Sequence, residues 1–348
     1  MEWIGSLITN ATHANVDTAL LCFPHEPDSC LRTARFVVIR FVMYILMLPT
    51  ILMTVFGNML VIITISYFKQ LHSPTNFIIL SLAVVDCLLG SMIMPFSMVR
   101  WVEGCWFLGE IFCKIHSSLD MTLSIVSILH LCLVSIDRYM AITDPLSYKM
   151  KVTNDRVVVG IAVIWLFSFS FSFGVVLSNV NLDGLEDLLM LSSCVGNCAL
   201  IFNRQWGVIA ALVAFFVPGT IMSCLYLKIF HVARKQAKVM AERTTIGNCE
   251  TKNRSSEQRE RKAAKTLGIV MGIFLLCWLP FFIMTIADPF LNFSTPVDVF
   301  DVLVWFGYLN STCNPLVYGF FYPRFQKAFK MIISKYVFHL NDSGNLTL

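Results

Sequence analysis

Residues 40–67 read RFVMYILMLPTILMTVFGNMLVIITISY, and no charged residue follows Arg40 until Lys69. The hydrocarbon core of a lipid bilayer is about 30 Å thick, and an α-helix crosses it in roughly 20 mostly apolar residues. The stretch is long enough for that, and its Pro and Gly are tolerated in membrane helices that pack in a bundle. It therefore predicts a transmembrane helix.

Six further stretches of this kind follow along the 348-residue chain. Of all residues 57% are apolar and only 14% are charged, whereas soluble domains carry about 25% charged residues. We therefore predict an all-α fold, a seven-transmembrane helix bundle with a short amphipathic cytoplasmic helix after helix 7. The predicted transmembrane helices span residues 40–67, 74–101, 110–142, 157–178, 205–233, 263–289 and 297–321.

The predicted organisation is an N-terminal segment over 1–39, a transmembrane domain over 40–321, and an amphipathic helix with a tail over 322–348. Lys and Arg are concentrated in alternate connections, above all in the link between helices 5 and 6, and in the tail. Cytoplasmic loops carry such an excess. We therefore expect an extracellular N-terminus, a cytoplasmic tail and a multi-pass protein of the plasma membrane.

The cysteines and one sequon fit this orientation. Asn10, in the sequence Asn10-Ala11-Thr12, falls outside the cell and is predicted to be glycosylated. Six of the twelve Cys also fall outside, and an even number in an oxidising compartment suggests disulfides without fixing which cysteines pair. These six are Cys22, Cys30, Cys105, Cys113, Cys194 and Cys198.

Asp120 is the main candidate for a binding residue, because an ionisable side chain within a membrane helix is costly and faces the bundle interior. It lies seven residues after Cys113, about two turns below the outer face. No Lys or Arg of a neighbouring predicted helix is an evident partner at its depth. A cationic ligand would complete the pair; alternatively, Tyr308 and water satisfy the carboxylate.

Aromatic residues favour the cationic ligand. Rings around a cation attract it by about 0.5–2 kcal/mol each, although the same rings are also common in ordinary helix packing. A carboxylate within an aromatic cage describes an ammonium site. The predicted ligand contacts are Asp120, Ser124, Trp278, Phe281, Phe282, Trp305 and Tyr308.

A polar cluster at the inner end of helix 3 suggests a switch. Asp137, Arg138 and Tyr139 are adjacent there, and Glu260 begins helix 6 on the same side. An ion pair between Arg138 and Glu260 would hold the two helices together in a resting state, and breaking it would open a cleft. The alternative is a solvated charged face.

Other classes of protein are less well supported. No Ser/His/Asp set, phosphate-binding Gly loop or HExxH motif stands out, so we predict neither an enzyme nor a metal site. The basic segments flank membrane helices, so no nucleic acid is expected as a partner. A cation or amine transporter with Asp86 and Asp120 along its path is the alternative from another class, against which the lack of an inverted repeat counts.

Several motifs stand in a fixed order along residues 40–335. They are Gly57-Asn58, the stretch 82–86 ending in Asp86, Asp137-Arg138-Tyr139, Trp165, Pro218 with Tyr226, Cys277-Trp278-Leu279-Pro280 and Asn314-Pro315-Leu316-Val317-Tyr318. Together they resemble the rhodopsin-like G-protein-coupled receptors. Asp120 matches the amine-binding aspartate of the aminergic branch. Within that branch, residues 310–325 resemble the helix 7 signature of the trace amine-associated receptors, except that Arg324 replaces its Trp.

The resemblance implies further roles. It implies a stimulatory G protein, arrestin and membrane lipid as partners, a sensory role in olfaction, and no cofactor except an allosteric sodium ion. It assigns Asp86, Ser127, Asn310 and Asn314 to the sodium site, Tyr318 to the switch, and Pro218, Ile128 and Phe274 to the relay towards helix 6. It pairs Cys113 with Cys198, Cys22 with Cys194, and Cys30 with Cys105.

Two departures from the patterns of aminergic relatives narrow the expected class of ligand. Ala210 and Ala214 stand on helix 5 where catechol-binding relatives carry serines, and no acid replaces them as in diamine-binding relatives. We therefore expect a G-protein-coupled receptor for small protonated trace or volatile monoamines with an apolar or aromatic tail. The missing serines disfavour a serotonin-type receptor, the nearer alternative. Ser168 also replaces a usual Pro on helix 4.

Overall fold

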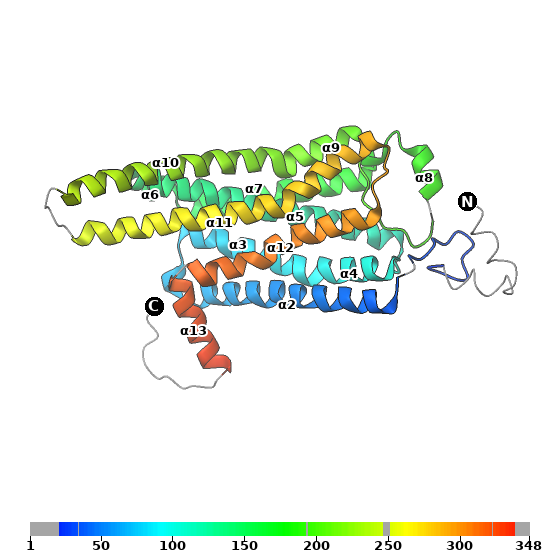
Figure 1. Ribbon diagram of the computed structural model, residues 1–348, viewed down its shortest axis with the longest axis horizontal. Helices are drawn as coiled ribbons and strands as arrows, with labels where there is room; N and C mark the ends of the chain where they lie inside the picture. Colours follow the sequence, from blue (N-terminus) through cyan, green and yellow to red (C-terminus); the bar gives the residue numbers. More distant parts are fainter. Residues whose placement is uncertain (1–20, 34, 193, 246–250, 322, 338–348) are drawn as a thin grey trace.

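The computed structural model describes residues 21–33, 35–192, 194–245, 251–321 and 323–337. Seven long helical spans run side by side in it, with the N-terminal segment at one end of the bundle and α13 at the other (Figure 1). The spans are α2 (Val37–Tyr67), α3 with α4 (Pro74–Leu88 and Met94–Glu103), α5 (Gly109–Thr143), α7 (Asn154–Ser178), α9 with α10 (Arg204–Ala211 and Val217–Thr245), α11 (Thr251–Ala287) and α12 (Val297–Phe321).

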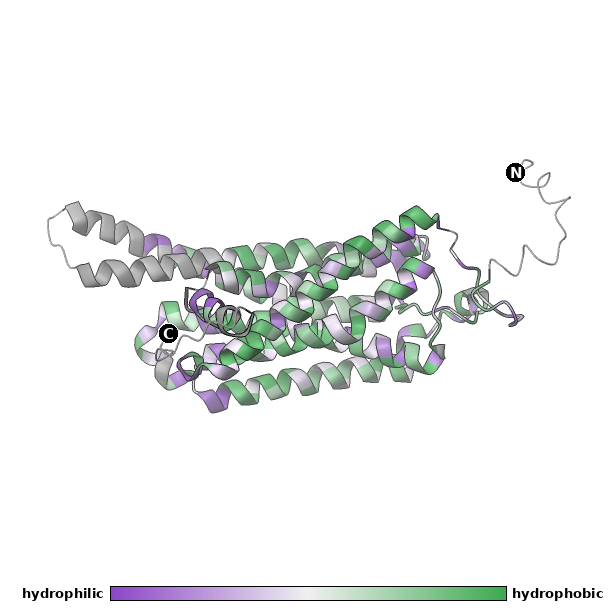
Figure 2. Ribbon diagram, turned by 90° about the horizontal axis from the view of Figure 1, so that it is seen from below, coloured by the Kyte–Doolittle hydropathy of each residue, from purple (hydrophilic) through white to green (hydrophobic). Residues whose placement is uncertain are grey.

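The surface of the bundle is apolar where lipid would cover it. Among the described residues, six of the spans are long and apolar enough to cross a membrane. Phe41 and Phe56 of α2, and Leu166 of α7, are more than half exposed, which a soluble surface of this extent would not tolerate. Figure 2 shows hydrophobic residues along the helices, with many of the polar residues towards the ends of the bundle. The fold is therefore the predicted seven-helix membrane bundle.

Two of the spans change their helical pitch next to a proline. A π-helical turn over Leu89–Ile93 joins α3 to α4 just before Pro95, and another over Leu212–Phe216 joins α9 to α10 just before Pro218. Proline lacks the amide donor and its ring disturbs the preceding turn, so the backbone ladder must adjust there. Both adjustments lie in the half of the bundle that holds the cavity described below.

The helix after the seventh span is amphipathic. In α13 (Pro323–Val337), the buried residues Phe325, Ala328 and Ile332 recur at helical spacing. Ala328 and Ile332 pack against Phe68 and Leu71, which follow α2. This contact lays α13 across the end of the bundle.

The N-terminal segment folds over the other end, which we call the disulfide end because Cys22, Cys30, Cys105, Cys194 and Cys198 gather there. The amide of Cys22 donates to the carbonyl of Cys30 over 2.9 Å, so the segment turns back on itself. The amide of Cys30 then donates to Val195, also over 2.9 Å, and that of Trp106 donates to Gly196 over 2.8 Å. Three separate parts of the chain are thereby aligned.

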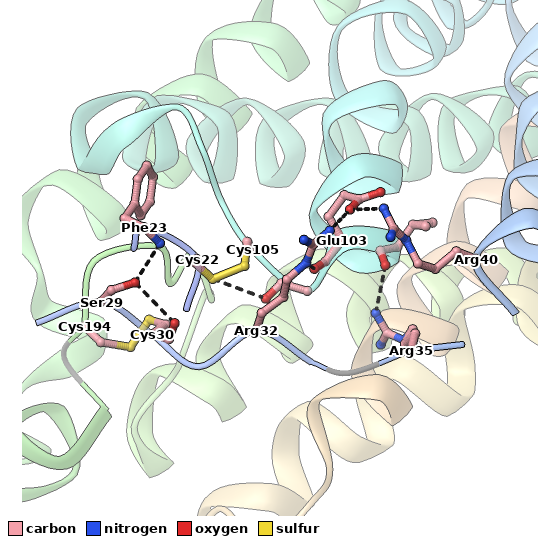
Figure 3. Close-up of a disulfide and its surroundings, with 12 residues drawn as sticks. Cys22, Phe23, Ser29, Cys30, Arg32, Arg35, Arg40, Glu103, Cys105 and Cys194 are labelled. Carbon is pink, nitrogen blue, oxygen red and sulfur yellow. Dashed lines mark hydrogen bonds and ion pairs between the residues drawn. A yellow bond between two sulfur atoms is a disulfide. The ribbon is translucent and has the colours of Figure 1, made fainter. Parts of the chain in front are cut away.

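Three disulfides join described cysteines: Cys113 to Cys198, and, as Figure 3 shows, Cys22 to Cys105 and Cys30 to Cys194. The implied pairings of Cys22 with Cys194 and of Cys30 with Cys105 are therefore wrong. The backbone pairing explains the difference, because Cys30 is bonded to Val195 and so lies beside Cys194. Cys22 packs against Gly196, where an added Cβ would meet the Cβ of Cys22 at 2.9 Å, and the sulfur of Cys22 bonds to that of Cys105.

Candidate functional site

A cavity of about 80 Å³ opens between the helices towards the disulfide end, large enough for several water molecules or for a small organic ligand in their place. Residues of α5, α9, α11 and α12 line it, together with the chain before α9 and the π-helical turn Leu212–Phe216 after it. Its polar lining is Asp120, Ser124, Thr285 and Tyr308. Its apolar lining is Met121, Ile125, Ile128, Leu200, Phe202, Ala210, Ala214, Trp278, Phe281, Phe282 and Val304.

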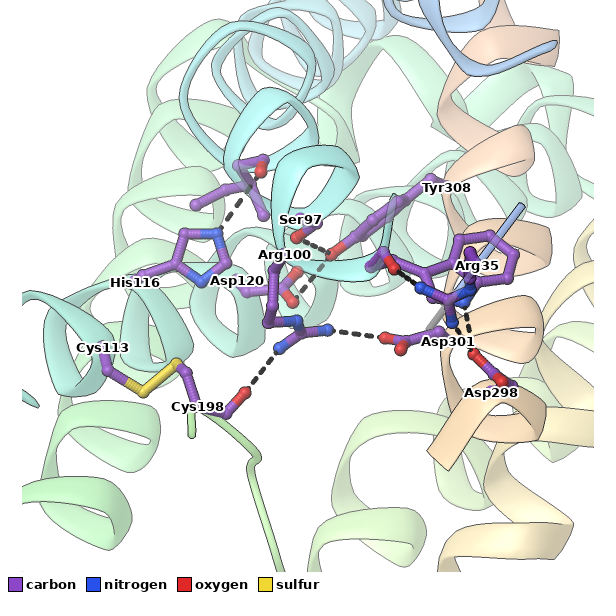
Figure 4. A network of polar contacts seen from close by, with 12 residues as sticks. Arg35, Ser97, Arg100, Cys113, His116, Asp120, Cys198, Asp298, Asp301 and Tyr308 are labelled. Atoms are coloured by element: carbon purple, nitrogen blue, oxygen red, sulfur yellow. Dashed lines mark hydrogen bonds and ion pairs between the residues drawn. A yellow bond between two sulfur atoms is a disulfide. The ribbon is translucent and has the colours of Figure 1, made fainter. Parts of the chain in front are cut away.

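Asp120 is held in this cavity by neutral partners. The Tyr308 hydroxyl donates to its Oδ2 over 2.8 Å, and Ser124, one turn along α5, is a second hydrogen-bond partner. The Tyr308 oxygen also lies 3.3 Å from the Ser97 hydroxyl of α4 (Figure 4). Hydroxyl groups orient the carboxylate without removing its charge. The contact between Tyr308 and Asp120 is the one that the alternative interpretation, a carboxylate satisfied by Tyr308 and water, expected. The carboxylate also faces an almost wholly apolar cavity.

A built-in cation lies nearby, which the sequence analysis did not find. Arg100 of α4 is close enough for its charge to act on Asp120. Its guanidinium is bound elsewhere, however, with Nη2 2.8 Å from Oδ1 of Asp301 and Nη1 3.0 Å from the carbonyl oxygen of Cys198. Among the described side chains, no Lys or Arg forms an ion pair with Asp120, in agreement with the expectation, but the nearby charge of Arg100 was missed. The available signal was that Arg100 and Asp301 are both ionisable residues within predicted membrane spans.

The aromatic residues of α11 form one wall of the cavity. Trp278 and Phe281 meet edge to face with ring centroids 6.0 Å apart, and Phe282 stacks on Phe215 at 5.0 Å. Trp305 differs from the expectation, because it packs against Tyr308 in the neighbouring core and is not among the residues that line the cavity. The orientation of α12 about its own axis places Val304 and Tyr308, rather than Trp305, on the side of the helix that faces the cavity.

The residues assigned to the relay lie directly beneath this wall. Ile128 and Phe274 are fully buried in one core cluster, and Phe274 stacks on Phe215 at 5.3 Å. Pro218 is buried three residues further along the chain than Phe215. A ligand that moves Phe282 would therefore press on Phe274 through Phe215.

Comparison with known proteins agrees with this geometry. Residues 57–318 match the family described as 7 transmembrane receptor (rhodopsin family). The chain is 49% identical over 324 residues to trace amine-associated receptor 4 of Mus musculus, covering 92% of this chain and 93% of that one. It is 50% identical over 328 residues to trace amine-associated receptor 2 of Rattus norvegicus (94% and 95% covered), and 49% identical over 309 residues to trace amine-associated receptor 1 of Macaca mulatta (88% and 91% covered).

The chain belongs to the trace amine-associated receptor family. It is therefore a membrane-spanning G-protein-coupled receptor and not an enzyme, and it acts between a ligand and a G protein.

A second polar site of the receptor surrounds Asp86, in the middle of the bundle. Ser127 donates to its Oδ1 over 3.0 Å, the Asn314 amide donates to its Oδ2 over 2.6 Å, and Ser311 is a further partner. Sequence reasoning missed Ser311. Asn310 lies nearby in the sequence, but its buried amide nitrogen has no hydrogen-bond partner among the described residues.

The receptor's third polar cluster lies at the end of the bundle opposite the disulfides. Arg138 pairs with the neighbouring Asp137, whose carboxylate also accepts bonds from Thr75 over 2.8 Å and Tyr148 over 2.7 Å. Burial and the hydrogen bond to Asp137 raise the pKa of Tyr148, so its hydroxyl remains a donor. Tyr139 lies next to this cluster, with the Lys228 ammonium 5.9 Å from its ring centroid.

Three predicted features fall outside what the structure describes. The side chain of Glu260, the expected partner of Arg138, is not among the described side chains, and Asn10 precedes the described residues. Arg324, at the departure from the family's helix 7 signature, is likewise beyond the described side chains. Tyr318 is described, and its ring lies 5.8 Å from that of Phe325 in α13.

Proposed function

We propose that the receptor binds a small protonated monoamine in the cavity and stimulates adenylate cyclase through a stimulatory G protein. The observation that carries the proposal is the Asp120 carboxylate, held by the neutral hydroxyls of Tyr308 and Ser124 in an apolar cavity. The nearby Arg100 guanidinium is bound to Asp301 and to the Cys198 carbonyl, so Asp120 has no cation in direct contact, and a buried charge without a partner is costly. A ligand ammonium would supply the missing positive charge.

The shape of the lining supports an apolar or aromatic tail on that ligand. With the ammonium at Asp120, the tail would extend between Trp278, Phe281 and Phe282 on one side and Ala214 on the other. Ala210 and Ala214 add no hydrogen-bonding group, so a hydroxylated ring gains nothing there. Thr285 donates to the Phe281 carbonyl over 2.9 Å and is occupied by its own helix.

In the proposed mechanism, the ligand favours one of two arrangements of α11, and the population shifts towards it. Pro280 interrupts the backbone ladder of α11 within the wall of the cavity, which makes it a hinge. Movement about this hinge would separate Arg138 from Glu260 and open the end opposite the disulfides to a G protein, and later to arrestin. The disulfide end is then extracellular, with Asn10 glycosylated there, and the receptor lies in the plasma membrane.

The cluster around Asp86 fits the proposed allosteric sodium ion. Sodium prefers oxygen ligands, and the cluster offers the carboxylate of Asp86 with the hydroxyls of Ser127 and Ser311. The buried Oδ1 of Asn58, whose amide lies 3.2 Å from the Ser311 carbonyl oxygen, has no hydrogen-bond partner among the described residues and is a further oxygen nearby. A bound ion would hold α3, α5 and α12 together at this level.

The experiment compares the wild type with Asp120→Asn in cells that carry a cyclic AMP reporter, with 2-phenylethylamine, its N,N-dimethyl derivative and 1,5-diaminopentane as ligands. Loss of a charge-assisted contact of about 1.5–3 kcal/mol lowers the potency of the monoamines roughly 10- to 150-fold. Asp187→Asn is the matched control, because it removes one exposed carboxylate from α8 (Glu186–Ser192) at the same end.

Full monoamine potency in Asp120→Asn, at equal surface abundance, would refute the anchor. A preference of the wild type for 1,5-diaminopentane would refute the monoamine assignment. Amine flux into liposomes that contain the receptor without G protein would favour the transporter instead.

A further inference from the structure

We propose that Arg100 and Asp301 form a charge triad with Asp120 that limits the ligand to one positive charge, and that Asp301 is the positioning residue that keeps Arg100 off Asp120. The inference rests on the proposed amine site and says which ligand charge that site accepts. The three side chains come from α4, α12 and α5 and belong to one polar network (Figure 4). Of the three, Asp120 lines the cavity.

Arg100 is the cation that can compete with a ligand for Asp120. Arg100 lies three residues after Ser97 on α4, one turn away on the same side of the helix. Ser97 contacts Tyr308, which contacts Asp120. The charge of Arg100 acts on both Asp120 and Tyr308 in the present arrangement. Arg is always protonated, so this cation is permanent.

Asp301 binds the Arg100 guanidinium and so keeps it from pairing with Asp120. Its Oδ1 lies 2.8 Å from Nη2 of Arg100, and both side chains are largely buried, 10% and 22% exposed respectively. The carbonyl oxygen of Cys198 takes the other terminal nitrogen at 3.0 Å, and the disulfide to Cys113 fixes that carbonyl relative to α5. The guanidinium is therefore bound on two sides, with neither bond directed to Asp120.

The charges then set the ligand class. Two carboxylates and one guanidinium leave a net charge of minus one, which a monoamine neutralises. Without Asp301, Arg100 and Asp120 neutralise each other and no place for an amine remains. Without Arg100, two carboxylates remain, a pattern that suits a dication. A buried charge that loses its partner is strongly destabilising, which drives each rearrangement.

His116 is the other titratable group near Asp120, four residues earlier on α5. Its Nε2 lies 3.3 Å from the carbonyl oxygen of Ile93, and its ring is packed against Trp106 at 5.2 Å and Phe96 at 6.2 Å. These contacts hold the ring above the carboxylate. His116 is unchanged in every variant below, so its contribution cancels.

The test measures the potency of 2-phenylethylamine in the cyclic AMP assay for the wild type, Asp301→Asn, Arg100→Gln with Asp301→Asn, and Asp301→Glu. We expect a loss of roughly 10- to 100-fold in Asp301→Asn, because a released Arg100 occupies Asp120. The double variant removes the competitor and should return to within about threefold of the wild type. Asp301→Glu keeps the charge and should retain most of the potency. Surface abundance is measured for each variant by an N-terminal epitope.

Restoration in the double variant is also expected of a merely structural pair, because it removes the unpaired Arg100 charge. Ligand charge separates the two roles: Arg100→Gln should raise the potency of 1,5-diaminopentane relative to 2-phenylethylamine, whereas a structural defect lowers both potencies alike. Unchanged potency in Asp301→Asn, or a double variant as weak as the single one, overturns the proposal. If Asp301→Asn does not reach the surface, Arg100→Gln decides, because the potency of 1,5-diaminopentane relative to 2-phenylethylamine must then rise. If it does not rise, the proposal fails. A wild type that responds to no amine contradicts the amine site itself, and this inference falls with it.

Discussion

Gly307 of α12 lies against the indole ring of Trp278 so closely that a single added methyl group tests the wall of the cavity. A Cβ at position 307 would meet ring carbons of Trp278 at 2.6, 2.8 and 2.9 Å. Carbon atoms prefer separations of about 3.5–4.0 Å, so the ring must retreat by about 1 Å or α12 must shift. Trp278 is only 4% exposed, and the free space next to it is the cavity.

Gly307→Ala should therefore both destabilise the receptor and narrow the amine site. Overpacking a core costs about 1–3 kcal/mol, which corresponds to a loss of roughly 5- to 150-fold in amine potency if the ring moves into the cavity. Thermal unfolding of the purified receptor and the potency of 2-phenylethylamine in the cyclic AMP assay measure the two effects.

Gly272→Ala is the matched control, because a Cβ at position 272 of α11 meets nothing within 4 Å. Both substitutions gain about 1 kcal/mol of helix propensity, so the difference between them isolates the contact with Trp278. A Gly307→Ala receptor as stable and as sensitive to the amine as Gly272→Ala would refute the packing of Trp278 on α12, and with it the described wall of the cavity.

Two further outcomes follow from the same geometry. Ala214→Ser places a hydroxyl in the cavity lining and should raise the potency of 4-hydroxyphenylethylamine relative to 2-phenylethylamine about 2- to 10-fold in the cyclic AMP assay, the value of one hydrogen bond. An unchanged ratio would mean that the ligand ring does not reach the π-helical turn Leu212–Phe216. Replacing both Cys22 and Cys105 by Ser opens a loop with a sequence separation of 83 and should lower the free energy of unfolding by about 2–4 kcal/mol, seen as a lower melting temperature, whereas Cys224→Ser, at a free and exposed cysteine, should not. Equal melting temperatures would contradict a stabilising disulfide between Cys22 and Cys105.

The membrane spans could be predicted from the sequence because each is a local property of the chain. The first predicted span, 40–67, corresponds to α2 (Val37–Tyr67), and the last, 297–321, corresponds to α12. The prediction fell short where helices leave the membrane. Hydropathy ends the fifth span at 233, whereas α10 continues to Thr245 through polar residues, since water supports a helix that lipid no longer covers.

Contacts between distant segments were harder to predict. Arg100 and Asp301 are 201 positions apart, and each on its own is only a charge near a helix end. The choice of Cys194 rather than Cys105 for Cys30 depends on one backbone hydrogen bond to Val195. Trp305 and Val304 are adjacent in the sequence, and only the rotation of α12 decides which of them faces the ligand. Asp120 was recognised because its residue type and depth alone carry the signal.

One helix, α12, contacts Arg100, the amine site at Asp120 and the cluster around Asp86, and this has an energetic consequence. Asp301 and Tyr308 are two turns apart on one face of α12, and Ser311 follows one turn later as a partner of Asp86. Pro315 interrupts the helix only after these three residues. An amine at Asp120 that changes the position of Tyr308 therefore changes the position of Ser311 as well. Linkage then makes the effect reciprocal: an ion in the proposed sodium site changes the affinity for the amine by the same factor by which the amine changes the affinity for the ion. Binding of the amine at Asp120, beside Arg100 and Asp301, is for this reason coupled to the occupancy of the site at Asp86, a carboxylate deeper in the bundle that the ligand does not touch.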